Sequence, residues 1–228
     1  MIRSKFIQVP AHKSIYGKES EPYSRRVNCY YAVPEGEEKT GILVLPTNFG
    51  ESAALESSQQ KREALADKYK LLVMQCDYFG WEFMQEGKNE KTGVAREVLA
   101  KVFTEEELDM MYNGDILDFS RMLQLGSQKE EKIVVKIKEC SQETLDNCND
   151  QSIMQALDLI AAVSFLISHS EEEKLKLDKR KIIFYGTQHG GYLAHLCNLL
   201  APHLLSLVID AAAWISPAYL KNLRTLTY

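Results

Sequence analysis

A glycine-rich turn between an apolar strand and a helix is the part of this sequence best suited to chemistry. The apolar run Lys181–Tyr185 predicts a strand, and apolar residues with helical spacing follow from Leu193 onwards. Between them, Gly186 and Gly190 flank Gln188 at two positions on either side, which is the Gly-x-Ser-x-Gly layout of a nucleophile elbow. Glycines there let strand and helix approach closely, while the central residue stands at the tip of a sharp, strained turn.

The segment Gly186–Ala194, GTQHGGYLA, resembles the GxSxGGYxA elbows of peptidase- and esterase-type members of the α/β-hydrolase superfamily. The similarity extends over nearly the whole chain in the order of the expected elements, and it is closest to a bacterial branch of that superfamily. The resemblance implies an elbow scaffold made by Gly186, Gly190 and Gly191. For a parent enzyme it implies hydrolysis of an ester, amide or peptide bond.

Gln188 departs from that pattern at the position that decides the mechanism. The superfamily carries Ser, Cys or Asp there, whereas a carboxamide has no ionisable proton to give to a base and is a very poor nucleophile. Thr187 carries a hydroxyl, but it lies one residue away from the tip. We therefore expect no acyl-enzyme chemistry at this elbow.

The acid and the histidine of a catalytic triad are also missing from their usual places. In the superfamily they follow the nucleophile on loops after later strands. Here only about 18 residues follow Asp210, and no histidine follows His203. The resemblance thus predicts a sheet that stops after the sixth strand, in a truncated relative or in the N-terminal part of a longer protein. Asp210 is expected to be structural.

The other candidate residues lie beside the elbow or after other strands. His189 follows the tip, where the resemblance assigns its backbone N–H to an oxyanion hole, while its imidazole is expected to pack against neighbouring loops. Asn48-Phe49-Gly50 occupies the place of the second oxyanion donor, although a plain turn explains Asn and Gly equally well. Asp77 and Tyr78 lie at the carboxyl end of a strand, where parallel sheets usually bind ligands. Asp77 could contact a substrate there, or its carboxylate could close a loop by hydrogen bonds to the backbone.

These residues require a sheet to position them. Strands are predicted at Lys5–Val9, Arg26–Val33, Gly41–Leu45, Leu71–Cys76, Lys181–Tyr185 and Leu205–Ile209. Helices are predicted over Ser52–Tyr69, from Asp150 or Ser152 onwards, and after the elbow. The alternation predicts an α/β fold with a mostly parallel, doubly wound sheet flanked by helices, in a single domain over residues 1–228.

Residues 81–149 differ from the rest because they are charge-rich and helix-like. Thr104 and Glu107 form the pattern of a capping box, and Asn113-Gly114 could interrupt the helical spacing that follows. The segment Lys132–Lys136 fits a short strand or more helix. We expect residues 81–149 to be a helical insertion that forms a lid.

Composition excludes several classes of partner. The 228 residues carry a net charge of −5, which argues against nucleic acid and against an anionic membrane surface. No metal-ligand spacing and no phosphate-binding glycine motif occurs, so neither a metal nor a cofactor is expected. Scattered cysteines and an N-terminus without an apolar core predict a soluble cytoplasmic protein. An open sheet edge predicts a homodimer.

Two functions remain compatible with the sequence. The first is a hydrolase-family protein whose parent cleaved an ester, amide or peptide bond and in which this chain lacks the Ser-His-Asp machinery. The second is a non-catalytic protein that binds a small-molecule or peptide ligand, or a partner, on a hydrolase scaffold, since a fold alone does not decide function.

Overall fold

A computed structural model gives the fold of most of the chain. It describes residues 2–15, 25–36, 39–48, 51–81, 96–114, 116–129, 136–138, 150, 152–215 and 225–227. The chain divides into two compact units, one made of residues 1–85 and 143–217 and the other of residues 86–142 and 218–228. The elbow belongs to the first unit.

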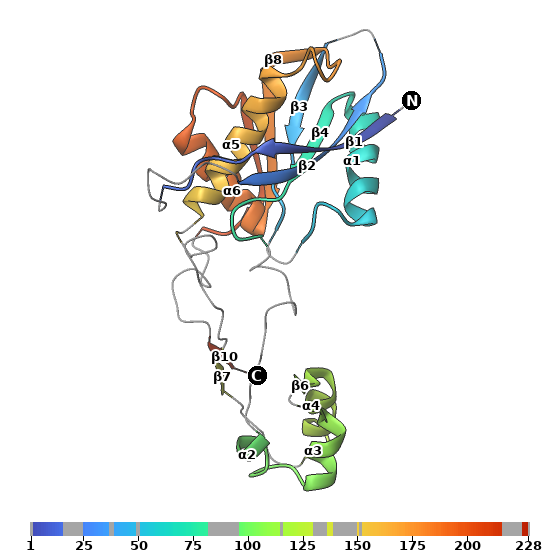
Figure 1. Cartoon of the computed structure of the whole chain (residues 1–228), viewed down its shortest axis with the longest axis vertical. Coiled ribbons are helices and arrows are strands. Elements are labelled where there is room, and N and C mark those ends of the chain that lie inside the picture. The colour runs from blue at the N-terminus through green and yellow to red at the C-terminus, as the bar shows by residue number, and fades with distance from the viewer. Residues whose placement is uncertain are drawn as a thin grey trace. The chain divides into compact units, whose positions relative to one another are not determined.

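A six-stranded mixed sheet forms the centre of the first unit (Figure 1). In the order in which they pair, its strands are β1 (Ile2–Pro10), β2 (Arg26–Pro34), β4 (Leu72–Cys76), β3 (Thr40–Val44), β8 (Leu177–Thr187) and β9 (Leu207–Ala213). β4, β3, β8 and β9 run parallel, whereas β1–β2 and β2–β4 are antiparallel. The parallel part was predicted correctly, and the antiparallel pair extends it on one side.

Helices cover both faces of this sheet, which explains its nearly continuous apolar strands. All residues of β3 and β4 are buried. Successive side chains of a strand point to opposite faces, and Leu43 and Val73 pack with Ala66 of α1 (Glu56–Tyr69) on one of them. Figure 1 shows α5 (Ile153–Ser168) and α6 (Gln188–Leu200) on the other side of the sheet from α1.

Two helix starts differ from the sequence prediction. α1 begins at Glu56 and not at Ser52, because the residues before it form a turn in which the Ser52 hydroxyl accepts from the Ala54 N–H. α5 begins at Ile153, directly after Ser152, and the Asp150 carboxylate accepts a hydrogen bond from the Met154 N–H at 2.7 Å. A charged side chain therefore caps this helix from outside it.

β9 is one of the two edge strands of the sheet, and β1 is the other. Leu207 and Ile209 are among its exposed apolar side chains, 49% and 41% exposed. Unpaired edges invite pairing with another chain. The homodimer stays a prediction that sedimentation at several concentrations tests.

The second unit has its own small apolar core. Its elements are α2 (Arg96–Leu99), α3 (Glu105–Met111), β5 (Tyr112–Asn113), β6 (Ile116–Leu117), α4 (Phe119–Gly126), and the paired strands β7 (Lys136–Lys138) and β10 (Thr225–Thr227). The capping box of Thr104 and Glu107 is confirmed. A β5–β6 hairpin around Gly114, whose φ is 63°, divides the helical run. Lys132–Val135 lie outside the described residues, and the lid role of residues 81–149 stays a prediction.

Within the described ranges, no helix has the length and apolar character needed to cross a membrane. The same ranges contain no cluster of three or more His, Cys, Asp or Glu side chains that could hold a metal ion.

Candidate functional site

The candidate site is the turn at which β8 runs directly into α6. Thr187 ends the strand and Gln188 begins the helix. Gln188 has a φ of 45°, in the left-handed region that residues with a Cβ rarely adopt. Its side chain is exposed. The residue that the glycine spacing puts at the tip thus has the strained backbone typical of an elbow.

The elbow glycines lie where no side chain fits. A Cβ on Gly186 would lie 2.4 Å from the backbone of Gly190, and one on Gly190 would lie 2.4 Å from the carbonyl oxygen of Pro46. A Cβ on Gly191 would approach the Cβ of Ala213 to 2.5 Å. Strand, helix and the loop after β3 therefore meet at backbone-to-backbone contact around the tip.

Asn48 joins the loop after β3 to the elbow. Its Oδ1 accepts a hydrogen bond from the Gly190 N–H at 3.1 Å, and its Nδ2 donates to Thr187 Oγ1 and to Glu51 Oε1, both at 3.0 Å. These bonds make Asn48 a positioning residue for the elbow. Phe49-Gly50, predicted together with it, lies outside the described residues.

The imidazole of His189 lies behind the elbow and is fully buried. Its Nε2 lies 2.9 Å from Gln155 Oε1 on α5, and an oxygen acceptor there assigns the proton to Nε2. Its ring also lies 6.1 Å, between centroids, from those of Tyr78 and Trp214. Burial lowers the pKa of His189 to about 3, so the ring is neutral at pH 7.

This depressed pKa predicts a loss of stability in mild acid. Below about pH 6.5 the unfolded chain protonates this histidine, whereas the folded chain resists protonation down to about pH 3. The unfolded state therefore binds more protons, and stability falls as the pH falls through that window. Between pH 7 and pH 5 we expect His189 to account for a loss of about 2 kcal/mol in the free energy of unfolding.

Urea unfolding of wild type and of His189→Asn at both pH values measures this loss. The variant is less stable at pH 7, but the fall in its stability between the two pH values should be smaller by about 2 kcal/mol. Equal falls for the two proteins would contradict a buried neutral imidazole.

Asp77 and Tyr78 follow β4 and form hydrogen bonds with β2 and with the loop after β3. Asp77 is buried, and its Oδ2 accepts from Asn28 Nδ2 on β2 at 3.0 Å. The Tyr78 hydroxyl donates to the Thr47 carbonyl oxygen at 3.1 Å, and burial raises its pKa above the usual range. The Asp77 carboxylate thus contacts a side chain of the neighbouring strand β2, whereas Tyr78 lies beside the loop that carries Asn48. The ligand-binding and loop-closing roles of Asp77 both stay predictions.

The end of β9 is also tied to the elbow. The carbonyl oxygen of Gln188 accepts from the Trp214 N–H at 2.9 Å. Asp210 accepts from the Ala213 N–H at 2.7 Å and pairs with His195 Nε2 of α6 at 2.9 Å. The hydrogen bond from His195 holds the pKa of Asp210 below its usual range. This exposed pair links α6 to β9, and the structural role of Asp210 stays a prediction.

Comparison with solved structures defines the class of fold. The chain has an α/β-hydrolase-like fold, and it is similar to the esterase Est22 (TM-score 0.52, 9% identity, 94% of this chain and 45% of that one). It is similar to a bacterial heroin esterase too (TM-score 0.50, 12% identity, 97% of this chain and 49% of that one). The chain thus spans less than half the length of each esterase.

The sequence places the chain in one family. It belongs to the family DUF2920, described as proteins of unknown function, which it matches over residues 24–223. No curated protein matches the sequence.

Proposed function

We propose that this chain is a hydrolase-fold protein that binds an ester, amide or peptide ligand at its elbow without forming an acyl-enzyme. The observation that carries the proposal is Gln188, whose φ of 45° and exposure are those of an elbow tip while its side chain lacks a nucleophile. The two similar proteins are named as esterases, and these names support an ester or a related carbonyl compound as the ligand class.

The groups around the tip suit a carbonyl ligand. The carboxamide of Gln188 offers two N–H donors and an oxygen acceptor, which complement the oxygen and the N–H of an amide. α6 begins at the tip, so the positive end of its dipole and its first backbone N–H groups lie beside the ligand oxygen. The resemblance assigns one of these N–H groups to His189.

The histidines near the elbow favour binding over acyl transfer. The His189 side chain is buried and contacts Gln155, and its low pKa makes it a poor proton acceptor at pH 7. His195 pairs with Asp210 on the surface. Neither pair resembles a base held against a nucleophile at residue 188.

The test compares acylation with binding. We expect a fluorophosphonate to leave the mass of the protein unchanged, and any hydrolysis of p-nitrophenyl butyrate to be equal in wild type and Gln188→Ala. N-phenylbutanamide, a non-labile amide, should bind saturably and perturb the backbone NMR signals of Gln188 and His189. In Gln188→Ala that affinity should fall about tenfold, as for one lost hydrogen bond at a desolvated site.

A variant far from the elbow provides the control. Gln128→Ala, at an exposed residue of the second unit, should bind N-phenylbutanamide like wild type. Hydrolysis or labelling that disappears in Gln188→Ala would overturn the proposal, and so would identical amide binding by wild type and Gln188→Ala.

A further inference from the structure

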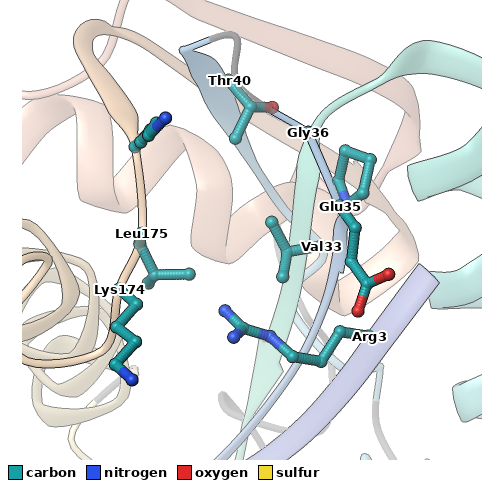
Figure 2. A pocket seen from close by; sticks show the side chains of 9 residues that line it. Arg3, Val33, Glu35, Gly36, Thr40, Lys174 and Leu175 are labelled. Atoms are coloured by element: carbon teal, nitrogen blue, oxygen red, sulfur yellow. The ribbon is translucent and has the colours of Figure 1, made fainter. Parts of the chain in front are cut away.

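A small pocket lies at the ends of the strands opposite to those that lead into the elbow. Its volume is about 180 Å³, and Arg3 of β1, Val33 of β2, Thr40 of β3 and the segment Lys174–Lys176 line it (Figure 2). Thr40 opens β3, and the segment directly precedes β8, whereas the elbow follows the other end of β8. Along β3, six residues separate Thr40 at the pocket from Pro46, whose carbonyl oxygen lies beside Gly190 of the elbow. At about 3.3 Å per strand residue the two places are roughly 20 Å apart, so one small ligand cannot touch both.

Three cations line this pocket. They are Arg3, Lys174 and Lys176. Among the described residues that line the pocket, Glu35 is the acidic one. Neither lysine has a carboxylate within 4.0 Å among the described residues. Three positive charges against one negative charge leave a surplus of two.

Arg3 is the residue that points most clearly to a ligand. Its Nε is buried but has no hydrogen-bond acceptor among the described residues, and its Nη2 reaches only the Glu173 carbonyl oxygen at 3.4 Å. Figure 2 shows its guanidinium reaching across the pocket towards the segment that carries Lys174 and Leu175. Buried donors in proteins are rarely left without an acceptor. The Arg3 guanidinium carries five N–H donors, so it has donors to offer to a ligand oxygen.

We propose that this pocket binds a small phosphate-bearing ligand. A phosphate monoester carries a charge close to −2 at neutral pH, which matches the surplus, and it offers three acceptor oxygens to donors on both walls. A guanidinium fork fits two phosphate oxygens at once. The buried side chains of Val33 and Leu175 lower the local dielectric constant and strengthen these contacts. The volume lies below that of drug-sized pockets, so any substituent on the phosphate is small.

Inorganic phosphate is the probe that tests this site in the full chain. At pH 7.5, with NaCl used to hold ionic strength constant, phosphate should shift the backbone NMR signals of Gly36, Thr40 and Leu175 saturably, with a Kd on the order of 1 mM. Sulfate should compete because it has the same charge and shape. Lys174→Gln and Arg3→Gln should each weaken binding about tenfold.

The controls separate a built site from general attraction of anions. Arg26→Gln changes an exposed arginine at the other end of β2 and should leave phosphate binding unchanged. Glu37 and Glu38 follow Gly36 in the sequence and lie outside the described residues, and replacing both by glutamine should leave binding equal or tighter. Equal shifts with NaCl alone would overturn the proposal. Wild-type affinity in Lys174→Gln, an exposed position at which a folding defect is not expected, would overturn it too.

Discussion

Replacing Asp158 by alanine is expected to lower the free energy of unfolding by about 3 to 5 kcal/mol. Asp158 lies on α5 with no exposed surface, and its carboxylate accepts two hydrogen bonds from the Arg25 guanidinium, both at 2.7 Å. It also accepts from the backbone N–H groups of His12 at 2.9 Å and Phe79 at 2.8 Å. Alanine removes all four bonds. The Arg25 guanidinium then keeps only the His12 carbonyl oxygen as an acceptor, at 3.0 Å, and the His12 and Phe79 N–H groups lose theirs.

This side chain joins three segments beyond the ends of paired strands. They are the chain after β1, the residues before β2 and the turn after β4. Burial raises the pKa of the Asp158 carboxyl, and the hydrogen bonds from Arg25 oppose that rise. Burial remains the larger of the two effects on this pKa, and removing Arg25 takes away what opposes it.

Urea unfolding of Asp158→Ala, Asp158→Asn and Arg25→Ala measures these contributions. Asparagine keeps an acceptor oxygen, so its loss should be smaller than that of alanine. Arg25→Ala should also be destabilising, because it leaves the fully buried Asp158 carboxylate with only the two backbone N–H donors. If Asp158→Ala cost under 1 kcal/mol, the carboxylate would not hold these segments together.

Replacing Gly186 by alanine is expected to cost about 3 kcal/mol or more, the upper end of the penalty for overpacking. The added Cβ would lie 2.4 Å from atoms of Gly190 and Gly191, all of which belong to the backbone. No side-chain rotation can relieve such a contact, so β8 and α6 must separate. The separation should also disturb the hydrogen bond between the Gly190 N–H and Asn48.

A matched glycine shows whether this cost comes from the close approach. Gly36 lies in the turn after β2, and a Cβ there would meet no atom within 4 Å. Gly36→Ala should change the stability by less than about 0.5 kcal/mol. Equal urea midpoints for the two variants would contradict the backbone contact at the elbow.

Local patterns in the sequence predicted the elements well and their pairing less well. The apolar runs located the central strands of the first unit, since β3 and β4 are buried along their whole length and β2 and β8 along part of theirs. The start of β8 was missed because Leu177–Lys181 is mostly charged and exposed. The direction of β2 was not predictable, since a strand's composition does not state whether its neighbour runs parallel or antiparallel.

The candidate site was predictable at its centre and not around it. Glycine spacing located Gln188 because two backbones that approach closely require glycines at fixed positions in the local sequence. The contacts of Asn48 with Gly190 and of Gln155 with His189 join positions 142 and 34 residues apart. Only the fold brings these partners together. One signal was present for Gln155 and Asp158, since polar residues in a helix of mostly apolar residues require buried partners.

The backbone bond between Trp214 and Gln188 has a spectroscopic consequence. The chain has two tryptophans, Trp81 and Trp214, and the ring of Trp214 lies 6.1 Å, between centroids, from that of His189. Replacing Trp81 by phenylalanine therefore leaves one indole as a native fluorophore fixed to the elbow. Its emission reports the polarity and order at the tip, so ligands can be screened there without a label or an assumed reaction.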